Sequence, residues 1–304
     1  MTPDIAIQTR DLTKRFGSVT ALENLSLEIP AGCIYGFLGP NGAGKSTTID
    51  ILLDLVRPSA GTATVLGYDT QDSPVAVRER TGVLLDGFTP YAKLTGRQHV
   101  ALAADAKDVD AEPTAVLERV ELTDAMDRAA GGYSKGMTQR LGLAMALVGE
   151  PDLLILDEPS TGLDPHGVAL MRDLIREEND RGATVCFSSH ILDQVEAVCD
   201  RVGILDDGRL IADDDVATLH EAVGDDTVVR IRTAEPPTGV RDRITSIDAV
   251  SGVRIDGDEL VVRCADDAAT ARVIAALERT DLAIESIETG GRSLERVFAA
   301  YTGG

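Results

Sequence analysis

The sequence predicts an α/β chain built from a large domain over residues 1–220 and a small α+β domain over residues 225–304. In the large domain, apolar strand-like runs alternate with helical periodicity, which is typical of a mostly parallel sheet. Helical periodicity over residues 95–150, with loops near 108–113 and at AAGGYSKG (129–136), interrupts this alternation and predicts an all-helical insertion at about residues 90–150. After the acidic run DDGRLIADDD (206–215) the composition changes and a second strand–helix pattern begins. A chain of 304 residues is long enough for both domains.

The first strands are expected within residues 4–38, where apolar and polar positions alternate and turns fall at FGS and PAG. A glycine-rich loop follows, and the periodicity of residues 42–56 predicts a helix. RPSAG (57–61) breaks the chain, and residues 63–69 are expected to form a short strand. Beyond the insertion the alternation resumes with a strand at 153–157, a helix at 166–180, a strand at 183–189 and a helix at 191–200.

The second domain has the element order β-α-β-β-α-β, which predicts a small ferredoxin-like unit. Its middle strands form a hairpin with the turn at DGD (256–258), and a last helix is expected at SLERVFAAYT (293–302). The expected elements are strands at 226–233 and 282–289, helices at 240–247 and 267–280, and the hairpin at 251–264. No motif with recognisable chemistry occurs in this domain.

The chain is strongly acidic, with 51 Asp and Glu against 29 Lys and Arg and a net charge of -22. This charge disfavours nucleic acid as a partner, because neutralising phosphates needs clustered positive charge. No apolar run reaches the roughly 18 to 20 residues that a bilayer crossing needs, and the first residues lack a signal-peptide pattern. We therefore expect a cytoplasmic protein that reaches a membrane only through a partner. The four scattered cysteines predict reduced core thiols.

The strongest motif is a glycine-rich phosphate loop between a strand and a helix, the context that such a loop requires. It fits G-x-x-x-x-G-K-[ST] and consists of Gly39, Pro40, Asn41, Gly42, Ala43, Gly44, Lys45, Ser46 and Thr47. The glycines let successive backbone N–H groups point at a β-phosphate. Lys45 adds a mobile charge for the β and γ phosphates, and Ser46 offers a hydroxyl to Mg²⁺. The alternative is a glycine turn that binds nothing.

Two carboxylates, Asp157 and Glu158, follow the buried strand LLIL, at the sheet edge where ligands bind in open α/β proteins. We expect Asp157 to hold Mg²⁺ through water and Glu158 to orient or deprotonate an attacking water. An acidic pair at this place is otherwise a helix cap. His190 and Asp164 come later, at strand ends or loops on the side of the γ-phosphate. A structural histidine and an ordinary turn residue are the simpler interpretations of these two.

The order and spacing of these motifs resemble the ATP-binding subunit of an ABC transporter. The resemblance covers residues 4 to about 215, with the phosphate loop, YSKGMTQR, LLILDEP, STGLD and SSH. KRFG and the closing SLERVF are most similar to the ABC-2-type export branch, which includes drug and antibiotic exporters. The preference for Asp over Glu and Arg over Lys is similar to that of haloarchaeal proteins, whose concentrated salt screens self-repulsion. The alternative is a merely acidic cytosolic protein.

The resemblance implies a RecA-like P-loop NTPase core with an antiparallel β subdomain and a helical insertion. Phe16 matches the aromatic residue that stacks on adenine, with a core phenylalanine as the alternative. Ser134 and Gly136 match the retained members of the signature turn, where Lys135 and Met137 depart from the family pattern. The backbone amides and the serine do the binding in such a turn, so both departures are expected to be tolerated.

Three further residues take roles from the resemblance. His190 matches the switch histidine that contacts the γ-phosphate, and Asp164 matches the loop aspartate that communicates across the dimer. Asp86 stands where the family usually has a glutamine that reaches the metal or the water. Being shorter and charged, Asp86 is expected to reach the metal only through water, or to be only a turn residue.

These motifs together predict an ATPase with ATP and Mg²⁺ as its ligands, in which Glu158 activates water while Lys45 and His190 stabilise the developing charge. The signature turn lies in the helical insertion, which points away from the chain's own nucleotide in the family's fold. Each chain's turn therefore closes the partner's ATP in a head-to-tail homodimer. A separate integral-membrane permease of the ABC-2 type is the expected second partner, at the cytoplasmic face of the cell membrane.

Two other classes of protein were weighed against this prediction. A soluble ABC-type ATPase of DNA repair or ribosome work usually adds a coiled coil, iron–sulfur cysteines or a second ATPase half, and none is present. A catalytically idle regulatory module does not need the intact Lys45, Asp157, Glu158 and His190. The cargo belongs to the membrane partner, and this sequence does not identify it.

Overall fold

The computed structural model places six strands in a central sheet of order β10-β9-β3-β8-β7-β6. It describes residues 4–223, 227–234, 237, 239–280, 282–290 and 298. Neighbouring strands from β9 to β6 pair in parallel, and β10 adds an antiparallel edge. The strands are β3 (Ile34–Leu38), β6 (Thr81–Leu84), β7 (Leu153–Asp157), β8 (Thr184–Ser189), β9 (Arg201–Asp206) and β10 (Arg209–Asp215). Every residue of β3, β7 and β8 is buried, as in strands covered on both faces, and the predicted α/β sheet is confirmed.

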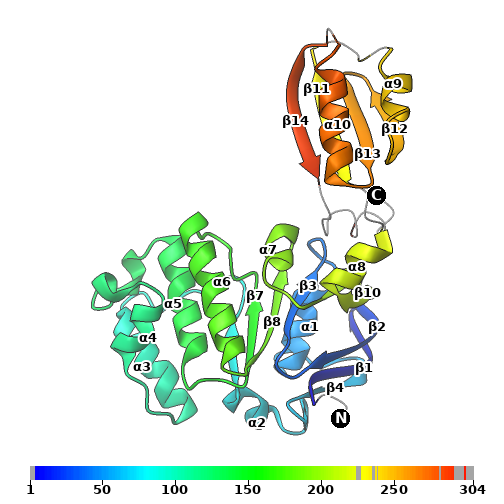
Figure 1. Cartoon of the computed structure of the whole chain (residues 1–304). Helices are drawn as coiled ribbons and strands as arrows, with labels where there is room; N and C mark the ends of the chain where they lie inside the picture. The colour runs from blue at the N-terminus through cyan, green and yellow to red at the C-terminus, as the bar shows by residue number, and fades with distance from the viewer. Residues whose placement is uncertain are drawn as a thin grey trace. The chain divides into compact units, whose positions relative to one another are not determined.

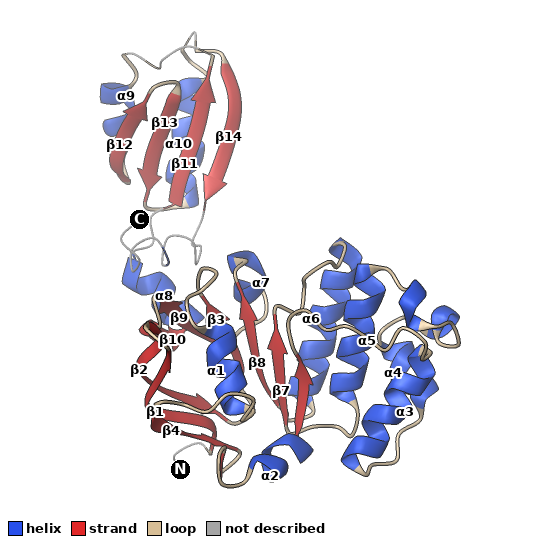
Figure 2. Cartoon of the chain, turned by 180° about the vertical axis from the view of Figure 1, so that it is seen from behind, coloured by secondary structure: helices blue, strands red, loops and turns tan. Residues whose placement is uncertain are grey.

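A second, antiparallel sheet has the order β2-β1-β4-β5. Its strands are β1 (Ile5–Phe16), β2 (Val19–Pro30), β4 (Ala60–Val65) and β5 (Tyr68–Asp69). The segment predicted as one short strand forms two, because the chain turns at Leu66 and Gly67, which both have positive φ. Helix α1 (Lys45–Leu52) lies between the two sheets (Figures 1 and 2), and one apolar core contains residues of α1 and of both sheets. This core fixes the start of α1 at the end of β3.

The helical insertion gathers on one side of the central sheet (Figure 1). It contains α3 (Gly96–Lys107), α4 (Pro113–Arg119) and α5 (Lys135–Leu147), with short 3₁₀ turns at Thr123–Ala125 and Ala130–Gly132. Helix α5 packs against β6 so closely that a Cβ at Gly142 would lie 2.5 Å from Leu84 Cδ1. These helices lie within the range in which the sequence predicts the insertion, about residues 90–150, and α5 is the helix that packs against the sheet.

Four further helices are α2 (Pro74–Glu79), α6 (Pro165–Asp180), α7 (Leu192–Glu196) and α8 (Val216–Val223). The sequence did not predict α2, β6, β9 or β10. Two of the missed strands contain a glycine in their interior, which weakens a strand pattern. A Cβ at Gly82 of β6 would meet the Ala146 carbonyl oxygen, and one at Gly203 of β9 would meet the Tyr35 hydroxyl. No helix in the described ranges is long and apolar enough to cross a membrane.

The chain divides into two units, Met1–Val216 and Ala217–Gly304, whereas the sequence placed the junction between residues 220 and 225. The second unit contains β11 (Thr227–Thr233), α9 (Arg241–Thr245), β12 (Val250–Asp256), β13 (Glu259–Cys264), α10 (Asp267–Leu277) and β14 (Ile284–Gly290). Its sheet has the order β12-β13-β11-β14 with antiparallel neighbours, which confirms the β-α-β-β-α-β prediction. Apart from Phe298, the helix predicted at 293–302 lies outside the described residues.

Candidate nucleotide-binding site

The phosphate loop joins β3 to α1 and lines a cavity of about 150 Å³. Gly42 and Gly44 have φ of +87° and +107°, which a residue with a side chain rarely adopts. A Cβ at Gly44 would also lie 2.6 Å from Leu22 Cδ2. The residues that line the cavity are Asn41, Gly42, Gly44, Lys45, Ser46, Thr47, Asp86 and Glu158. The structure therefore brings together the loop and two carboxylates that the sequence predicted separately.

Lys45 is almost fully buried, with its ammonium group at the wall of this cavity. Its Nζ donates to the Gly39 carbonyl at 2.7 Å and to the Pro40 carbonyl at 3.2 Å. The same Nζ lies 3.8 Å from Glu158 Oε1. A positive charge held by the loop's own carbonyls, next to a carboxylate, is suited to an anion entering the cavity.

Asp157 and Glu158 end strand β7, and Ser188 of the neighbouring strand β8 holds both of them. The Ser188 hydroxyl donates to Asp157 Oδ1, and its oxygen accepts the Glu158 backbone N–H at 2.9 Å. Ser188 is fully buried and Asp157 nearly so. Because β7 and β8 pair in parallel register, with Asp157 opposite Ser188, one hydroxyl fixes both residues.

The Glu158 side chain joins three predicted site residues. Its Oε2 lies 2.8 Å from His190 Nδ1, and its buried Oε1 lies 3.8 Å from Lys45 Nζ. Within the described part of the chain, Oε1 has no hydrogen-bond partner. A buried carboxylate oxygen with an open acceptor position, facing the cavity of the phosphate loop, is suited to accept a proton from a bound water.

Asp86 lies in the loop that follows β6 and lines the same cavity as Ser46 and Glu158. Its Oδ1 accepts the backbone N–H of Gly87 at 2.9 Å, so the carboxylate also shapes its own turn. Asp50 of α1 lies near Asp157. Burial, and then the charge of Asp157, raise the pKa of the Asp50 carboxyl.

The signature turn of Ser134 and Gly136 contacts the loop of residues 160–164, and neither the turn nor this loop lines the cavity. Ser134 caps α5, its Oγ accepting the Met137 N–H at 3.2 Å, and a Cβ at Gly136 would lie 3.1 Å from the Gly162 carbonyl oxygen. Asp164 caps α6, its Oδ1 accepting the Gly167 N–H at 2.7 Å. The structure thus places Ser134, Gly136 and Asp164 outside the lining of this chain's own phosphate-loop cavity.

Phe16 is not a core residue, since 49% of it is exposed at the end of β1. The Lys14 ammonium lies 4.7 Å from the centre of its ring. This excludes the alternative of a core phenylalanine and leaves an exposed aromatic face beside a cation. Of the cysteines, Cys33, Cys186 and Cys264 are buried, and burial raises the pKa of Cys33 to about 12.

Sequence reasoning missed two residues of the site, Ser188 and Gln139. Ser188 was part of the SSH motif, but nothing in the sequence pairs it with Asp157 before the strand order is known. Gln139 of α5 is buried, and its Nε2 donates to the Pro159 carbonyl at 3.0 Å. A glutamine on the buried face of an apolar helix is the signal that could have singled it out.

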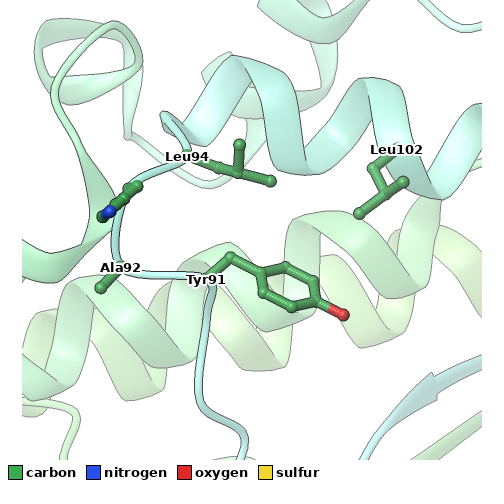
Figure 3. A pocket seen from close by; sticks show the side chains of 5 residues that line it. Tyr91, Ala92, Leu94 and Leu102 are labelled. Carbon is green, nitrogen blue, oxygen red and sulfur yellow. The ribbon is translucent and has the colours of Figure 1, made fainter.

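An apolar groove of about 490 Å³ lies just beyond the Asp86 loop, at the start of the insertion. Figure 3 shows the Tyr91 ring below the side chains of Leu94 and Leu102. Tyr91 is 67% exposed, and its ring stacks on that of the buried His99. His99 Nε2 accepts the Tyr91 N–H at 2.9 Å, and Nδ1 donates to the Thr95 carbonyl. The groove therefore has a firmly held wall and an unusually exposed aromatic surface.

The oxygen groups of the site fit Mg²⁺ bound together with a nucleotide. Mg²⁺ prefers oxygen ligands and is usually held by one or two carboxylates, waters and substrate phosphates. Ser46 and Asp86 line the cavity, and Asp157 ends the adjacent strand. In the described ranges, no group of three or more His, Cys, Asp or Glu is placed so that it could hold a metal ion by itself.

A phosphate loop between the first buried strand and helix of a mostly parallel sheet defines a P-loop nucleotide-binding protein. The family model of ABC transporters matches residues 22–161. The daunorubicin/doxorubicin resistance ATP-binding protein of Streptomyces peucetius is 37% identical over 312 residues, which cover 99% of this chain and 93% of that protein. The chain belongs to the ATP-binding subunits of ABC transporters, and it is an ATPase of that family.

Other relatives agree with this assignment. The linearmycin resistance ATP-binding protein of Bacillus subtilis is 30% identical over 98% of each chain, and the bacitracin transport ATP-binding protein of Bacillus licheniformis is 41% identical over 67% of this chain and 68% of that one. These relatives are bacterial and do not support a haloarchaeal origin. A solved ATP-binding subunit of an ABC transporter is 30% identical, with a TM-score of 0.67 over 71% of this chain and 92% of that one.

A dimeric ATP-binding cassette, solved in a post-hydrolysis state with ADP and phosphate, is similar in fold alone. Its identity to this chain is 24% and the TM-score is 0.64, with 69% of this chain and 98% of that one covered. ATP-binding subunits of the ABC transporter family pair with one another and with membrane permease components.

Proposed function

We propose that this chain hydrolyses Mg-ATP at the cavity of residues 39–47 to drive export through a permease of the ABC-2 type. The observation that carries the proposal is the Glu158 carboxylate, which lies between His190 and Lys45 with one oxygen free to accept a proton. The relatives named above are ATP-binding proteins of daunorubicin/doxorubicin resistance, bacitracin transport and linearmycin resistance, and a cargo of the drug or antibiotic class is part of the proposal.

In this mechanism Glu158 takes a proton from the water that attacks the γ-phosphate in line. Lys45 and His190 stabilise the negative charge that develops on the phosphoryl oxygens. Ser46 and Asp157 would hold Mg²⁺, with Asp86 contacting it through water, and the ion supplies charge neutralisation to the phosphates. Phe16 offers its exposed face to adenine.

The second half of the site comes from another copy of the chain. Ser134 and Gly136 do not line the cavity of their own phosphate loop, and Ser134 caps a helix of 13 residues whose first N–H groups can face an anion. A head-to-tail dimer would bring this turn, and Asp164 in the next loop, to the partner's ATP. The separate C-terminal unit, over about residues 225–304, is proposed as an accessory domain.

The groove of Tyr91, Leu94 and Leu102 is proposed as the docking place of the permease, at the cytoplasmic face of the membrane. It is continuous with the loop of Asp86, so a segment seated in it would sense that carboxylate. Its exposed surface is mainly apolar and carries one cation, Lys93, in a chain of net charge -22. The occupant that fits is an amphipathic cytoplasmic segment of the permease with apolar anchors.

Glu158→Gln tests the proposed reaction. The amide cannot take the proton, so ATP should still bind while turnover falls by at least about a hundredfold and a dimer accumulates. Glu118→Gln, at an exposed position of α4, is the matched control and should turn over ATP normally. If Glu158→Gln hydrolysed ATP at the parental rate, Glu158 would not be the base. Copurification of a permease separates the transporter from the alternative, a soluble ABC-type ATPase not coupled to transport.

The acidic composition supports a halophilic setting as a further part of the proposal. Screening by concentrated salt would relieve the repulsion among surplus carboxylates. The melting temperature should therefore rise as KCl is raised from about 0.1 M to about 2 M, where the Debye length falls from about 10 Å to below about 3 Å. A melting temperature that stays level or falls over this range would favour an ordinary acidic cytosolic protein.

A further inference from the structure

The main chain of Glu158 has an uncommon conformation. Its φ is +47°, in the left-handed region that a residue other than glycine keeps only when its surroundings enforce it. Ser188 holds the N–H of this residue, and His190 holds its carboxylate. The Glu158 carbonyl accepts the Thr161 N–H at 3.1 Å within the turn that follows, so a contact from outside this turn is needed to set the direction in which the chain leaves the site.

Gln139 of α5 supplies that contact. Its Nε2 donates to the Pro159 carbonyl at 3.0 Å and to the Glu158 carbonyl at 3.4 Å, and the residue is 9% exposed. Both acceptors belong to the two residues at which the chain turns after β7. A neutral amide can serve two carbonyls with its two N–H groups and adds no charge next to the carboxylate of Glu158.

The same helix begins at the signature turn. Ser134 caps α5, and Gly136 in its first turn packs on the Gly162 carbonyl, with a Cβ at Gly136 only 3.1 Å away. Gln139 follows within the next turn. A helix transmits displacement along its axis as a stiff element, so movement of the first turn also moves Gln139 relative to Glu158.

We propose that Gln139 is a positioning residue that ties α5 to the main chain of Glu158. When the turn of Ser134 closes on the partner's ATP, this tie sets the glutamate of the same chain in its working geometry. The inference rests on the proposed function, in which Glu158 activates water and the Ser134 turn acts in the other chain's site. It adds a route by which each ATP site controls hydrolysis at the other.

Gln139→Leu in the full chain removes both hydrogen bonds and keeps a similar volume. We expect kcat for ATP to fall about ten- to a hundredfold, the usual cost of a misplaced catalytic group. The KM for ATP should change less than about twofold, because no ATP contact is lost. Gln98→Leu is the control. It removes a glutamine of the same insertion whose Oε1 accepts only a local N–H, from Thr95, and kcat should stay parental.

Gln139→Glu gives a second readout that a merely structural role would not move. The ionised carboxylate of the introduced glutamate cannot donate a hydrogen bond to the two carbonyls, whereas the protonated carboxyl can donate one. Burial next to two carbonyl oxygens raises the pKa of this carboxyl. Relative to the parent, kcat of this variant should recover as the pH falls from about 8 to about 6. If Gln139→Leu does not fold, this pH profile decides, and a flat profile overturns the proposal.

Two comparisons separate this inference from the function on which it rests. If folded Gln139→Leu keeps the parental kcat, or if Gln98→Leu loses as much kcat as Gln139→Leu does, the role of Gln139 is overturned. In either case Glu158→Gln should still be inactive. Turnover in Glu158→Gln instead overturns the proposed function itself. The double variant Ser134→Ala with Gln139→Leu should lose less kcat than the product of the two single fold-losses, because both residues act through helix α5. A full product would show that the two residues act independently.

Discussion

Ser188→Ala tests whether one buried hydroxyl holds both acidic residues at the end of β7. The Ser188 Oγ donates to Asp157 and accepts the Glu158 N–H at 2.9 Å, with no exposure to solvent. A hydrogen bond to a charged group contributes about 1.5–3 kcal/mol, and a buried N–H left without a partner costs about 1–3 kcal/mol. We therefore expect the free energy of unfolding to fall by about 3–5 kcal/mol.

The measurement is urea unfolding followed by circular dichroism, for the transition of the unit over residues 1–216. With a slope of about 2–3 kcal/mol per molar urea, the midpoint should fall by about 1–2.5 M. Ser189→Ala is the matched control, since this buried serine accepts the nearby Ile191 N–H and holds no carboxylate. A loss below about 1 kcal/mol in Ser188→Ala, or an equal loss in the control, would refute the reasoning.

Three further changes have expected outcomes of their own. Gly44→Ala should abolish the rise in melting temperature that ATP causes, and should lower the melting temperature without ATP more than Gly42→Ala does. Both glycines have positive φ, but only a Cβ at Gly44 meets other atoms, so equal effects of the two changes would contradict this. Burial raises the pKa of Asp213 above 3.8, so the stability it contributes at low pH is lost as the pH rises through the folded pKa. Asp213→Asn should therefore gain stability relative to the parent between about pH 4 and 7, and a constant difference would count against it. Tyr91→Glu should reduce copurification with the permease, whereas Val75→Glu, at another exposed apolar position, should not; equal recovery would remove the groove from the interface.

The sequence predicted those parts of the site that are contiguous along the chain. The loop from Gly39 to Thr47 and the pair Asp157 and Glu158 follow from local pattern and from the strand end they occupy. Asp86 was placed only by its spacing, and the structure locates it in the same cavity as Glu158. These residues lie together because a parallel sheet gathers the ends of its strands at one edge.

The contacts between distant segments could not be predicted in the same way. Ser188 meets Asp157 because β8 lies beside β7, which depends on the strand order. Gln139 reaches Pro159 because α5 approaches the sheet closely, and the glycine that permits this approach, Gly142, looks unremarkable in an apolar helix. Periodicity gives the buried face of a helix but not the carbonyl groups that this face will meet.

The acidic surplus and the phosphate site make opposite electrostatic demands on the chain. A net charge of -22 repels a nucleotide at long range, whereas the buried Lys45 attracts it at short range. Salt at about 1 M reduces the Debye length to about 3 Å, which removes the long-range repulsion but screens a buried contact much less. Ordinary phosphate sites weaken as salt rises because their cations are exposed. This site depends on one enclosed ammonium and backbone N–H groups, so the same salt that relieves the surface leaves the attraction in the cavity largely intact.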